Sequence, residues 1–195
     1  FEDLIGQEAM VRTLTNAFAT GRIAHAFMLT GVRGVGKTTT ARLLARALNN
    51  ETETIDRPSL TLTAHGRHDA AIMAGQHMDV MEMDAASHTG VNDIRDILES
   101  VRYAPVEARY KVYVLDEVHM LSTQAFNALL KTLEEPPPHA KFIFATTEIR
   151  KVPVTILSRC QRFDLRRVEP EILVEHLARI ADREGMKIEQ DALAL

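Results

Sequence analysis

The sequence predicts an α/β fold with a mostly parallel sheet, and three observations support this prediction. A glycine-rich stretch at 31–36 joins an apolar run, 26–29, to a helical pattern that extends to residue 49. Two further apolar runs, 112–115 and 142–145, each end in polar residues, with another helical pattern between them. Short buried strands that alternate with amphipathic helices form parallel sheets, because each helix crosses over between two strands.

The composition is that of an ordinary globular protein. The 195 residues are 46% hydrophobic and 26% charged, and the formal net charge is −4, so the chain has no overall basic signature for nucleic acid. Any contact with DNA must come from a local patch or from partner subunits. Cys160 is the single cysteine, and no apolar run approaches the ~20 residues of a membrane span. With no signal-peptide pattern either, we expect a cytoplasmic protein without a membrane partner.

The chain opens at Phe1 and closes at Leu195 within a helical pattern, so we expect it to be a fragment of a longer protein. A first helix should pack one face inward and end at Gly21. Its inward positions are Val11, Leu14, Thr15 and Phe18. The run 26–29 then reads as a buried strand.

The residues from Gly31 to Thr38 match G-x-x-x-x-G-K-[ST], the phosphate-binding P-loop. The strand before it and the helix after it are the context that the motif requires. Glycines let the backbone N–H groups face phosphates, and the helix N-terminus adds a positive dipole end. Lys37 should reach the β- and γ-phosphates, and the Thr38 hydroxyl should bind Mg²⁺. The bland alternative is a glycine-rich turn with a solvated lysine.

The predicted nucleotide-binding residues are Gly31, Val32, Arg33, Gly34, Val35, Gly36, Lys37, Thr38 and Thr39. The helix that follows should bury one stripe of small and apolar side chains. These are Ala41, Leu44, Ala45 and Leu48.

The segment 50–78 is the least regular part of the chain. His65, His68 and His77 together suggest a metal site, but their spacing is poor for metal ligands. We therefore interpret this segment as a polar loop that enters a short helix around 70–74.

Two carboxylates follow the apolar run 112–115. In parallel sheets, ligands bind beyond the C-terminal strand ends, so Asp116 is placed to hold Mg²⁺ and Glu117 to orient or activate an attacking water. A solvated pair of acids at a strand end is the alternative. Before this run, 80–84 reads as a strand, and Ser87 or Thr89 should cap a helix that Pro105 stops. The buried stripe of that helix is predicted to be Val91, Ile94, Leu98 and Val101.

The C-terminal third continues the alternation. Ser122 should cap a helix with Phe126, Leu129, Leu130 and Leu133 on one face, and the strand 142–145 ends near Thr146 and Thr147. Such a strand-end hydroxyl could contact the γ-phosphate or the attacking water. The run 162–165 is the last predicted strand. A helix from Pro170 to Gly185 should turn inward the residues Ile172, Leu173, His176, Leu177 and Ile180, and another helix is expected near Glu189.

These residues resemble the AAA+ ATPases and, within them, the bacterial clamp-loader ATPases. The P-loop matches their Walker A motif and 112–117 their Walker B motif, while Ser158-Arg159-Cys160 matches the SRC motif of clamp-loader subunits. Ile5-Gly6-Gln7-Glu8 is similar to a motif near the adenine pocket. The runs 84–87, 116–122 and 127–137 are the most specific, and the match covers nearly the whole chain.

The resemblance implies a five-stranded sheet in a nucleotide-binding domain at 1–166, and the start of a helical lid at 167–195. It implies that Lys37, Asp116 and Glu117 are catalytic, that Thr147 is the sensor-1 residue, and that Arg159 acts in trans at the ATP site of a neighbouring subunit. A guanidinium suits transition-state charge on phosphate, although a local salt bridge is the alternative for Arg159. The implied cofactors are ATP and Mg²⁺.

The partners that the resemblance implies are other clamp-loader subunits, namely delta, delta-prime and further copies of the ATPase subunit, together with the sliding clamp and primed DNA. One departure from the family concerns zinc. Relatives carry a small zinc module with four cysteines after the P-loop helix, and here Asn50, Thr63, Gly66 and Asp69 stand at those positions. Because no thiolate is left, we expect no structural zinc and a segment that is held by packing or is mobile.

Three functions follow from these observations. The first is an ATP-hydrolysing clamp-loader subunit that opens the sliding clamp and loads it onto primed DNA during replication. The second is a non-hydrolysing stator subunit of the delta-prime type, which the intact Lys37, Thr38, Asp116 and Glu117 argue against. The third is another AAA+ motor, such as a branch-migration helicase, which the SRC and Glu-Glu-Pro-Pro signatures disfavour.

Overall fold

A five-stranded sheet forms the centre of the protein. The computed structural model describes residues 4–62, 65–87 and 91–185. Its strands are β1 (Ala26–Thr30), β2 (Val80–Asp84), β3 (Lys111–Asp116), β4 (Ala140–Thr146) and β5 (Gln161–Asp164). They lie in the order β2-β3-β4-β1-β5, and all four neighbouring pairs are parallel. The predicted α/β class is confirmed, and the described sheet is parallel throughout rather than mostly so.

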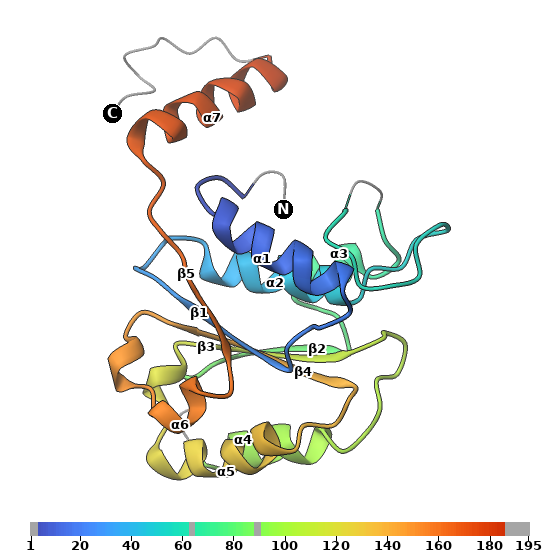
Figure 1. Cartoon of the computed structure of the whole chain (residues 1–195), viewed down its shortest axis with the longest axis vertical. Helices are drawn as coiled ribbons and strands as arrows, with labels where there is room; N and C mark the ends of the chain where they lie inside the picture. The colour runs from blue at the N-terminus through green and yellow to red at the C-terminus, as the bar shows by residue number, and fades with distance from the viewer. Residues whose placement is uncertain (1–3, 63–64, 88–90, 186–195) are drawn as a thin grey trace.

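Helices cover both faces of this sheet (Figure 1). On one face lie α1 (Glu8–Ala19), α2 (Lys37–Leu48) and α3 (Asp69–Met73), and on the other lie α4 (Val91–Ser100), α5 (Thr123–Glu134) and α6 (Val154–Leu157). Two 3₁₀ turns, η1 (Val118–Met120) and η2 (Ile149–Lys151), follow β3 and β4. Both faces of a parallel sheet are covered in this way because its strands are apolar on both sides. All residues of β1 and β4 are buried, in agreement with this rule.

The hydrophobic core therefore has two halves, one on each face. Phe142 and Phe144 of β4 point to the half that α4, α5 and α6 cover, and Ile143 between them points to the half under α1 and α2. Alternate residues of a strand reach opposite faces, so one apolar run supplies both halves. Leu129 of α5 and Leu44 of α2 are among the buried side chains that close the two halves.

Most of the predicted helices are present, with shifts of a few residues. The buried stripe of α2 is confirmed, and the Ser122 hydroxyl accepts a hydrogen bond from the backbone N–H of Ala125 at the start of α5. Thr15 was predicted to face inward, but it is exposed, and its hydroxyl donates to the backbone oxygen of Val11. The helix α4 ends at Ser100, before Pro105. Its buried residues are Ile94 and Ile97, and Leu98 is half-buried. Thr89, one of the two predicted caps of this helix, lies outside the described residues.

The helix α7 (Pro170–Arg183) corrects a prediction. Its apolar stripe was expected to turn inward, but Ile172, Leu173, Leu177 and Ile180 are all exposed, and His176 is half-buried. Figure 1 shows α7 standing apart from the sheet, beyond the end of β5. An amphipathic pattern shows that a helix has an apolar face but does not identify what covers that face. The helix predicted near Glu189 lies outside the described residues.

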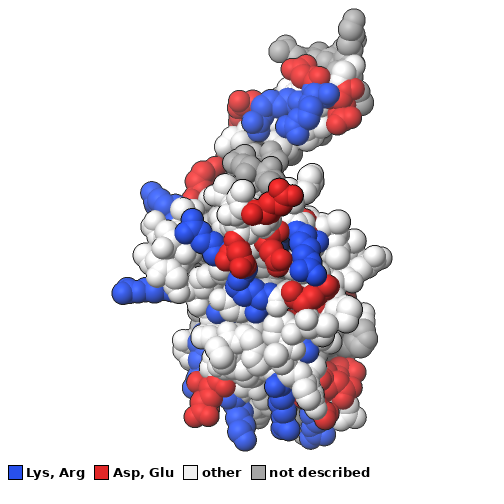
Figure 2. Space-filling model, turned by 90° about the vertical axis from the view of Figure 1, so that its right-hand side faces the viewer, with Lys and Arg blue, Asp and Glu red and all other residues white. Residues whose placement is uncertain are grey.

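The exposed charges are mixed in sign on the face that Figure 2 shows, where acidic and basic side chains are interspersed. None of the helices in the described ranges is both long and apolar enough to cross a lipid bilayer.

Candidate nucleotide-binding site

The predicted site residues, apart from Arg159, meet at one edge of the sheet. The strands β3, β4 and β1 are neighbours and run parallel, so their C-terminal ends lie side by side. Thr30 at the end of β1 pairs in register with Thr146 at the end of β4. Polar residues that follow parallel strands are thus brought together from distant parts of the sequence, at the edge where such sheets bind ligands.

Glycines shape the loop between β1 and α2. Gly36 caps α2 with a φ of 93°, which is a left-handed conformation that side chains disfavour. At Gly31, an added Cβ atom would lie 2.9 Å from the backbone oxygen of Leu165. The loop therefore packs directly against the chain that leaves β5, and only glycine fits at that point.

The Lys37 side chain curls back over this loop. Its ammonium group donates hydrogen bonds to the backbone oxygens of Gly31 and Val32, both at 3.0 Å, and the residue is buried. An ammonium has three donors, so two are used by the loop itself among the described contacts. Lys37 is consequently held at the centre of the loop, in the position from which the motif predicts contact with phosphate oxygens.

Thr38 and Asp116 join the loop to the sheet. The Thr38 hydroxyl donates a 2.6 Å hydrogen bond to Asp116 Oδ2, and Asp116 Oδ1 accepts the backbone N–H of Glu117 at 2.8 Å. A hydroxyl oxygen and a carboxylate oxygen are hard donors, the kind that Mg²⁺ prefers. The pair therefore fits the predicted magnesium site in its chemistry.

A cavity of about 380 Å³ lies against these residues. Its lining consists of Arg33, Gly34, Gly36, Lys37, Thr38, Thr39, Asp116 and Glu117. An adjoining cavity of about 350 Å³ has Val32 and Val35 from the loop on one side and Val168 and Leu173 on the other. Arg33 and Gly34 line both cavities, and Arg167 also lines the second, which is otherwise apolar. A larger cavity, of about 610 Å³ between α4 and α5, is lined by none of the predicted site residues.

Glu117 stands at the border of the polar cavity. Its Oε2 atom accepts hydrogen bonds from the Thr147 hydroxyl at 2.9 Å and from the Thr147 backbone N–H at 3.2 Å. The two residues that the sequence placed at different strand ends are therefore in direct contact. Thr147 itself does not line the cavity, so its hydroxyl lies behind Glu117 in this structure.

Arg159 lies away from the other predicted residues. It follows α6, and its guanidinium donates to Glu134 Oε1 at 2.7 Å and to the backbone oxygen of Thr155 at 2.7 Å. It does not line the cavity of the loop. Within this one chain Arg159 makes the local salt bridge that was its alternative interpretation, and its action on a neighbouring subunit stays a prediction.

Sequence reasoning missed His119, which follows Glu117 by two residues. Its Nδ1 atom lies 2.9 Å from Thr146 Oγ1 and 3.3 Å from Glu117 Oε2. A motif search extended by two positions beyond the acidic pair would have found this histidine. Its contact with Thr146 of β4 could not be predicted, because threonines are common at strand ends and do not by themselves indicate a contact.

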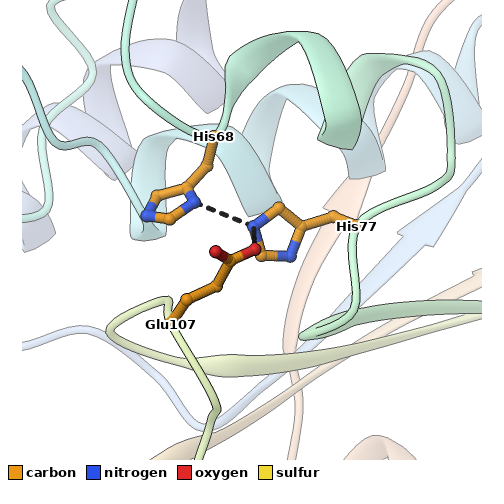
Figure 3. A group of neighbouring side chains, drawn as sticks. All are labelled: His68, His77 and Glu107. Carbon is orange, nitrogen blue, oxygen red and sulfur yellow. Dashed lines mark hydrogen bonds and ion pairs between the residues drawn. The ribbon is translucent and has the colours of Figure 1, made fainter.

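A second cluster lies in the segment 50–78 and its surroundings, where His68, His77 and Glu107 bring three potential ligand atoms within 4.8 Å of one another (Figure 3). Both histidines are buried, and His77 Nε2 lies 2.9 Å from His68 Nδ1 and 3.5 Å from Glu107 Oε1. His65, the third histidine that the sequence suggested, is exposed and is not part of this cluster. Glu107 comes from the chain before β3, so spacing could not reveal it.

The contacts of this cluster form a chain of hydrogen bonds, which argues against a metal site. His77 Nδ1 accepts the backbone N–H of Asp79 at 3.0 Å, so the proton of a neutral His77 sits on Nε2 and is donated to His68. His68 then directs its own Nε2 proton to Glu51 Oε2 at 3.3 Å. A metal on His77 Nε2 would move the ring proton to Nδ1, against the Asp79 N–H. Burial, together with the neighbouring His68, lowers the pKa of His77 and so favours this neutral state.

The positions that carry zinc ligands in the resembled family are also occupied otherwise. Asp69 accepts the backbone N–H of Gly66 at 2.7 Å and forms a 2.6 Å salt bridge with Arg46 of α2. Asn50 is buried, and its side-chain amide donates to Thr61. Thr63 lies outside the described residues. This set of donors does not fit a zinc ion, because it has no thiolate and its one carboxylate is already paired with an arginine.

Comparison with solved structures supports the fold. The RuvB Holliday junction branch migration motor of Thermotoga maritima aligns with a TM-score of 0.64 at 22% identity, over 97% of this chain and 55% of that chain. A DNA polymerase III gamma subunit-related protein from the same organism aligns with a TM-score of 0.60 at 20% identity, over 91% of this chain and 52% of that one. Both likenesses are of the fold, a five-stranded parallel sheet with helices on both faces.

Residues 6–169 match the family model described as DNA polymerase III, delta subunit, and the chain belongs to this family. It is 50% identical over 197 residues to DNA polymerase III subunit tau of Escherichia coli and 48% identical over 195 residues to subunit tau of Bacillus subtilis. Both alignments span the whole of this chain, but they span only 30% and 34% of the two relatives. It is 46% identical to the gamma subunit of Buchnera aphidicola, of which it covers 53%.

Proposed function

We propose that this chain is the ATP-binding and ATP-hydrolysing part of a gamma/tau-type clamp-loader subunit, which uses ATP to open a sliding clamp and load it onto primed DNA. The proposal rests on one observation. A single cavity is lined by Lys37, Thr38, Asp116 and Glu117, and the Thr38 hydroxyl bonds to Asp116. The similarity to tau and gamma subunits along the full chain supports the choice of clamp loader over other AAA+ motors.

The loop residues bind the triphosphate. The negative phosphates are stabilised by the backbone N–H groups of Gly34 to Thr38 and by the dipole of α2. The Lys37 ammonium gives up its hydrogen bonds to the two backbone oxygens of the loop and donates instead to the β- and γ-phosphate oxygens. Thr38 and Asp116 would hold Mg²⁺. When bound, this ion neutralises charge on the phosphates. The apolar cavity beside Val35 and Val168 accommodates the base.

Glu117 orients the attacking water and accepts its proton. The water oxygen forms a bond to the γ-phosphorus while the bond from that phosphorus to the β–γ bridging oxygen breaks, so that ADP and phosphate result. Arg159 of one subunit contributes its guanidinium to the site of its neighbour, where it stabilises charge on the transferred group. To reach that site, the Arg159 guanidinium must give up its salt bridge with Glu134 of its own chain.

The wider assignments follow from this role. We place the nucleotide-binding domain at 1–166 and the start of a helical lid at 167–195, where α7 presents an apolar face for further helices. The proposed partners are the delta and delta-prime subunits, further gamma/tau copies, the sliding clamp and, through the assembled complex, primed DNA. The site of action is the replisome in the cytoplasm. No zinc is part of the proposal.

The test is ATP hydrolysis by the full-length parent, assembled with its partner subunits, with and without clamp and primed DNA. Strong stimulation by clamp and DNA together is the expected result. Tight ATP binding without hydrolysis would favour a delta-prime-like stator instead, and the role of Glu117 would be withdrawn. Branch migration without clamp or polymerase would favour a helicase motor.

A further inference from the structure

Glu117 has an unusual backbone that needs an anchor. Its φ of 45° and ψ of 44° make it the one described non-glycine residue with a positive φ. Side chains disfavour this left-handed conformation, and it persists where surrounding contacts hold it. The turn follows directly on β3, so its geometry decides where the Glu117 carboxylate lies relative to the cavity.

The contacts to this carboxylate fall on one oxygen only. Oε2 receives the hydroxyl and the backbone N–H of Thr147, and the Nδ1 atom of His119 lies 3.3 Å away. Oε1 accepts no hydrogen bond from the described part of the chain. The carboxylate is therefore fixed through one oxygen, while the other oxygen is left to accept a proton.

His119 is itself held firmly. Its side chain is only 6% exposed, its Nδ1 atom lies 2.9 Å from the hydroxyl oxygen of the fully buried Thr146, and its Nε2 atom lies 3.7 Å from Glu148 Oε1. Glu148 is bound in turn by Lys151 at 2.8 Å, which lowers the pKa of the Glu148 carboxyl. The imidazole thus bridges the turn after β3 and the end of β4.

The direction of the Nδ1 contacts follows from the charge of Glu117. If the Thr146 hydroxyl donated to Nδ1, the imidazole would turn a lone pair toward the Glu117 carboxylate, and the two would repel each other. With the proton on Nδ1, the same nitrogen donates to Thr146 Oγ1, which also accepts the backbone N–H of Glu148 at 3.0 Å, and it faces Glu117 Oε2 with a positive hydrogen. In this tautomer Nε2 turns its lone pair toward Glu148 Oε1, but that contact is longer, at 3.7 Å, and the Glu148 charge is already paired with Lys151. The closer Glu117 carboxylate therefore selects the proton on Nδ1.

We propose that His119 is a positioning residue for Glu117, fixing Oε2 through Nδ1 so that Oε1 is presented to the attacking water. This inference rests on the proposed ATP hydrolysis and names a further residue for the same site. His119 does not line the cavity, so it acts through Glu117 and not on the nucleotide. Its contribution should accordingly appear in turnover and not in nucleotide binding.

The experiment compares His119→Leu with His119→Asn in the full-length parent, assembled with its partners, clamp and primed DNA. The amide nitrogen of asparagine can take nearly the place of Nδ1, whereas leucine removes the donor. We expect His119→Leu to lower kcat roughly tenfold or more with KM and the Kd of a non-hydrolysable ATP analogue almost unchanged, and His119→Asn to recover most of the loss. A kcat for His119→Leu within about twofold of the wild type, or an equal loss in both variants, would overturn the inference.

Glu117→Gln in the same assembly separates this inference from the proposed function. If Glu117→Gln loses turnover and His119→Leu does not, Glu117 keeps its role and only the inference about His119 fails. If Glu117→Gln turns over like the wild type, or the wild type does not hydrolyse ATP, the proposed mechanism fails and the inference fails with it.

Discussion

The Thr38 hydroxyl donates a 2.6 Å hydrogen bond to Asp116 Oδ2, and this contact joins the first turn of α2 to the end of β3. Thr38→Ser keeps the hydroxyl and should retain magnesium-dependent nucleotide affinity, whereas Thr38→Ala should weaken it by roughly tenfold. Chelation of Mg²⁺ should weaken ATP binding in the wild type more than in Thr38→Ala. Titration of a fluorescent ATP analogue with and without EDTA measures both effects. Equal magnesium dependence in Thr38→Ala and Thr38→Ser would remove Thr38 from the metal site.

Lys37→Ala should abolish nucleotide binding. The change removes the one ammonium held at the centre of the loop, and we expect Kd for ATP to rise by roughly a hundredfold or more. The fold should persist, because Gly31 and Val32 lose only a side-chain donor to backbone oxygens at an open loop. Equilibrium titration checks the affinity, and circular dichroism checks the fold. Wild-type affinity in a folded Lys37→Ala variant would contradict the phosphate-binding role.

Arg159→Ala should leave ATP binding intact and remove the stimulated turnover of the assembled complex. Glu134→Gln is the matched control, because it breaks the same 2.7 Å salt bridge while leaving the guanidinium in place. If Arg159 acts in a neighbouring site, only Arg159→Ala loses turnover. If its role is the local salt bridge, the two variants are equally affected. Steady-state hydrolysis with clamp and primed DNA distinguishes these outcomes.

The buried imidazole of His77 should make the fold less stable in mild acid. Because the folded state lowers the pKa of His77 below 6.5, the unfolded chain binds more protons as pH falls through 6.5, and the free energy of unfolding decreases. The carboxylates of Glu51, Glu107 and Asp79 face His77 and its neighbour His68 and limit this loss. His77→Phe should show a smaller decrease between pH 7 and about pH 5, measured by urea unfolding. An identical decrease in His77→Phe would contradict the prediction.

Metal analysis of the purified full-length protein should find no stoichiometric zinc. The Asp69 carboxylate is paired with Arg46, and His77 uses Nδ1 as an acceptor, so neither group is free to coordinate a metal without losing a hydrogen bond. Elemental analysis by mass spectrometry, before and after dialysis against a chelator, measures the content. One zinc per chain that resists dialysis would refute the prediction.

Because of Lys141, the protein should become more stable as the pH rises into the mildly basic range. Its ammonium is buried at the start of β4, where it donates to the backbone oxygens of Ile23 and Ala24, and burial lowers its pKa to about 8. Above pH 8 the folded state releases a proton that the unfolded chain keeps, so the free energy of unfolding rises with pH, on the order of 3 kcal/mol at most by pH 10.5. Urea unfolding at pH 8 and 10 measures the rise. Lys141→Met should lack it, and the same rise in that variant would exclude Lys141 as its source.

The sequence was sufficient wherever the signal is local. The loop 31–38 and the pair Asp116 and Glu117 are each read from fewer than ten consecutive residues, and parallel pairing then fixes where they meet. The contacts of Glu117 with Thr147 and His119 were not predictable in this way. They depend on a positive φ at Glu117 and on the register of two strands, which no spacing pattern encodes.

The segment 50–78 and the helix α7 show which features the sequence could not predict. The hydrogen-bond chain from Asp79 to Glu51 was hidden because hydrogen-bond direction depends on the position of each ring nitrogen, which the sequence does not give. The stripe of α7 was correctly recognised as apolar and wrongly expected to face inward. Periodicity gives the composition of a face, whereas its burial depends on what packs against it.

The place of β1 in the sheet has a consequence for biosynthesis. This strand lies between β4 and β5, and its last residue, Thr30, bonds to Asp164, which the ribosome adds 134 residues later. The nascent chain must therefore carry the apolar run of β1 without either neighbour until β4 has been made, a period in which unpaired strands are open to chaperones or to misassociation. Leu165, which supports Gly31, follows directly after β5. The loop 31–36 is thus made long before the residue that supports it.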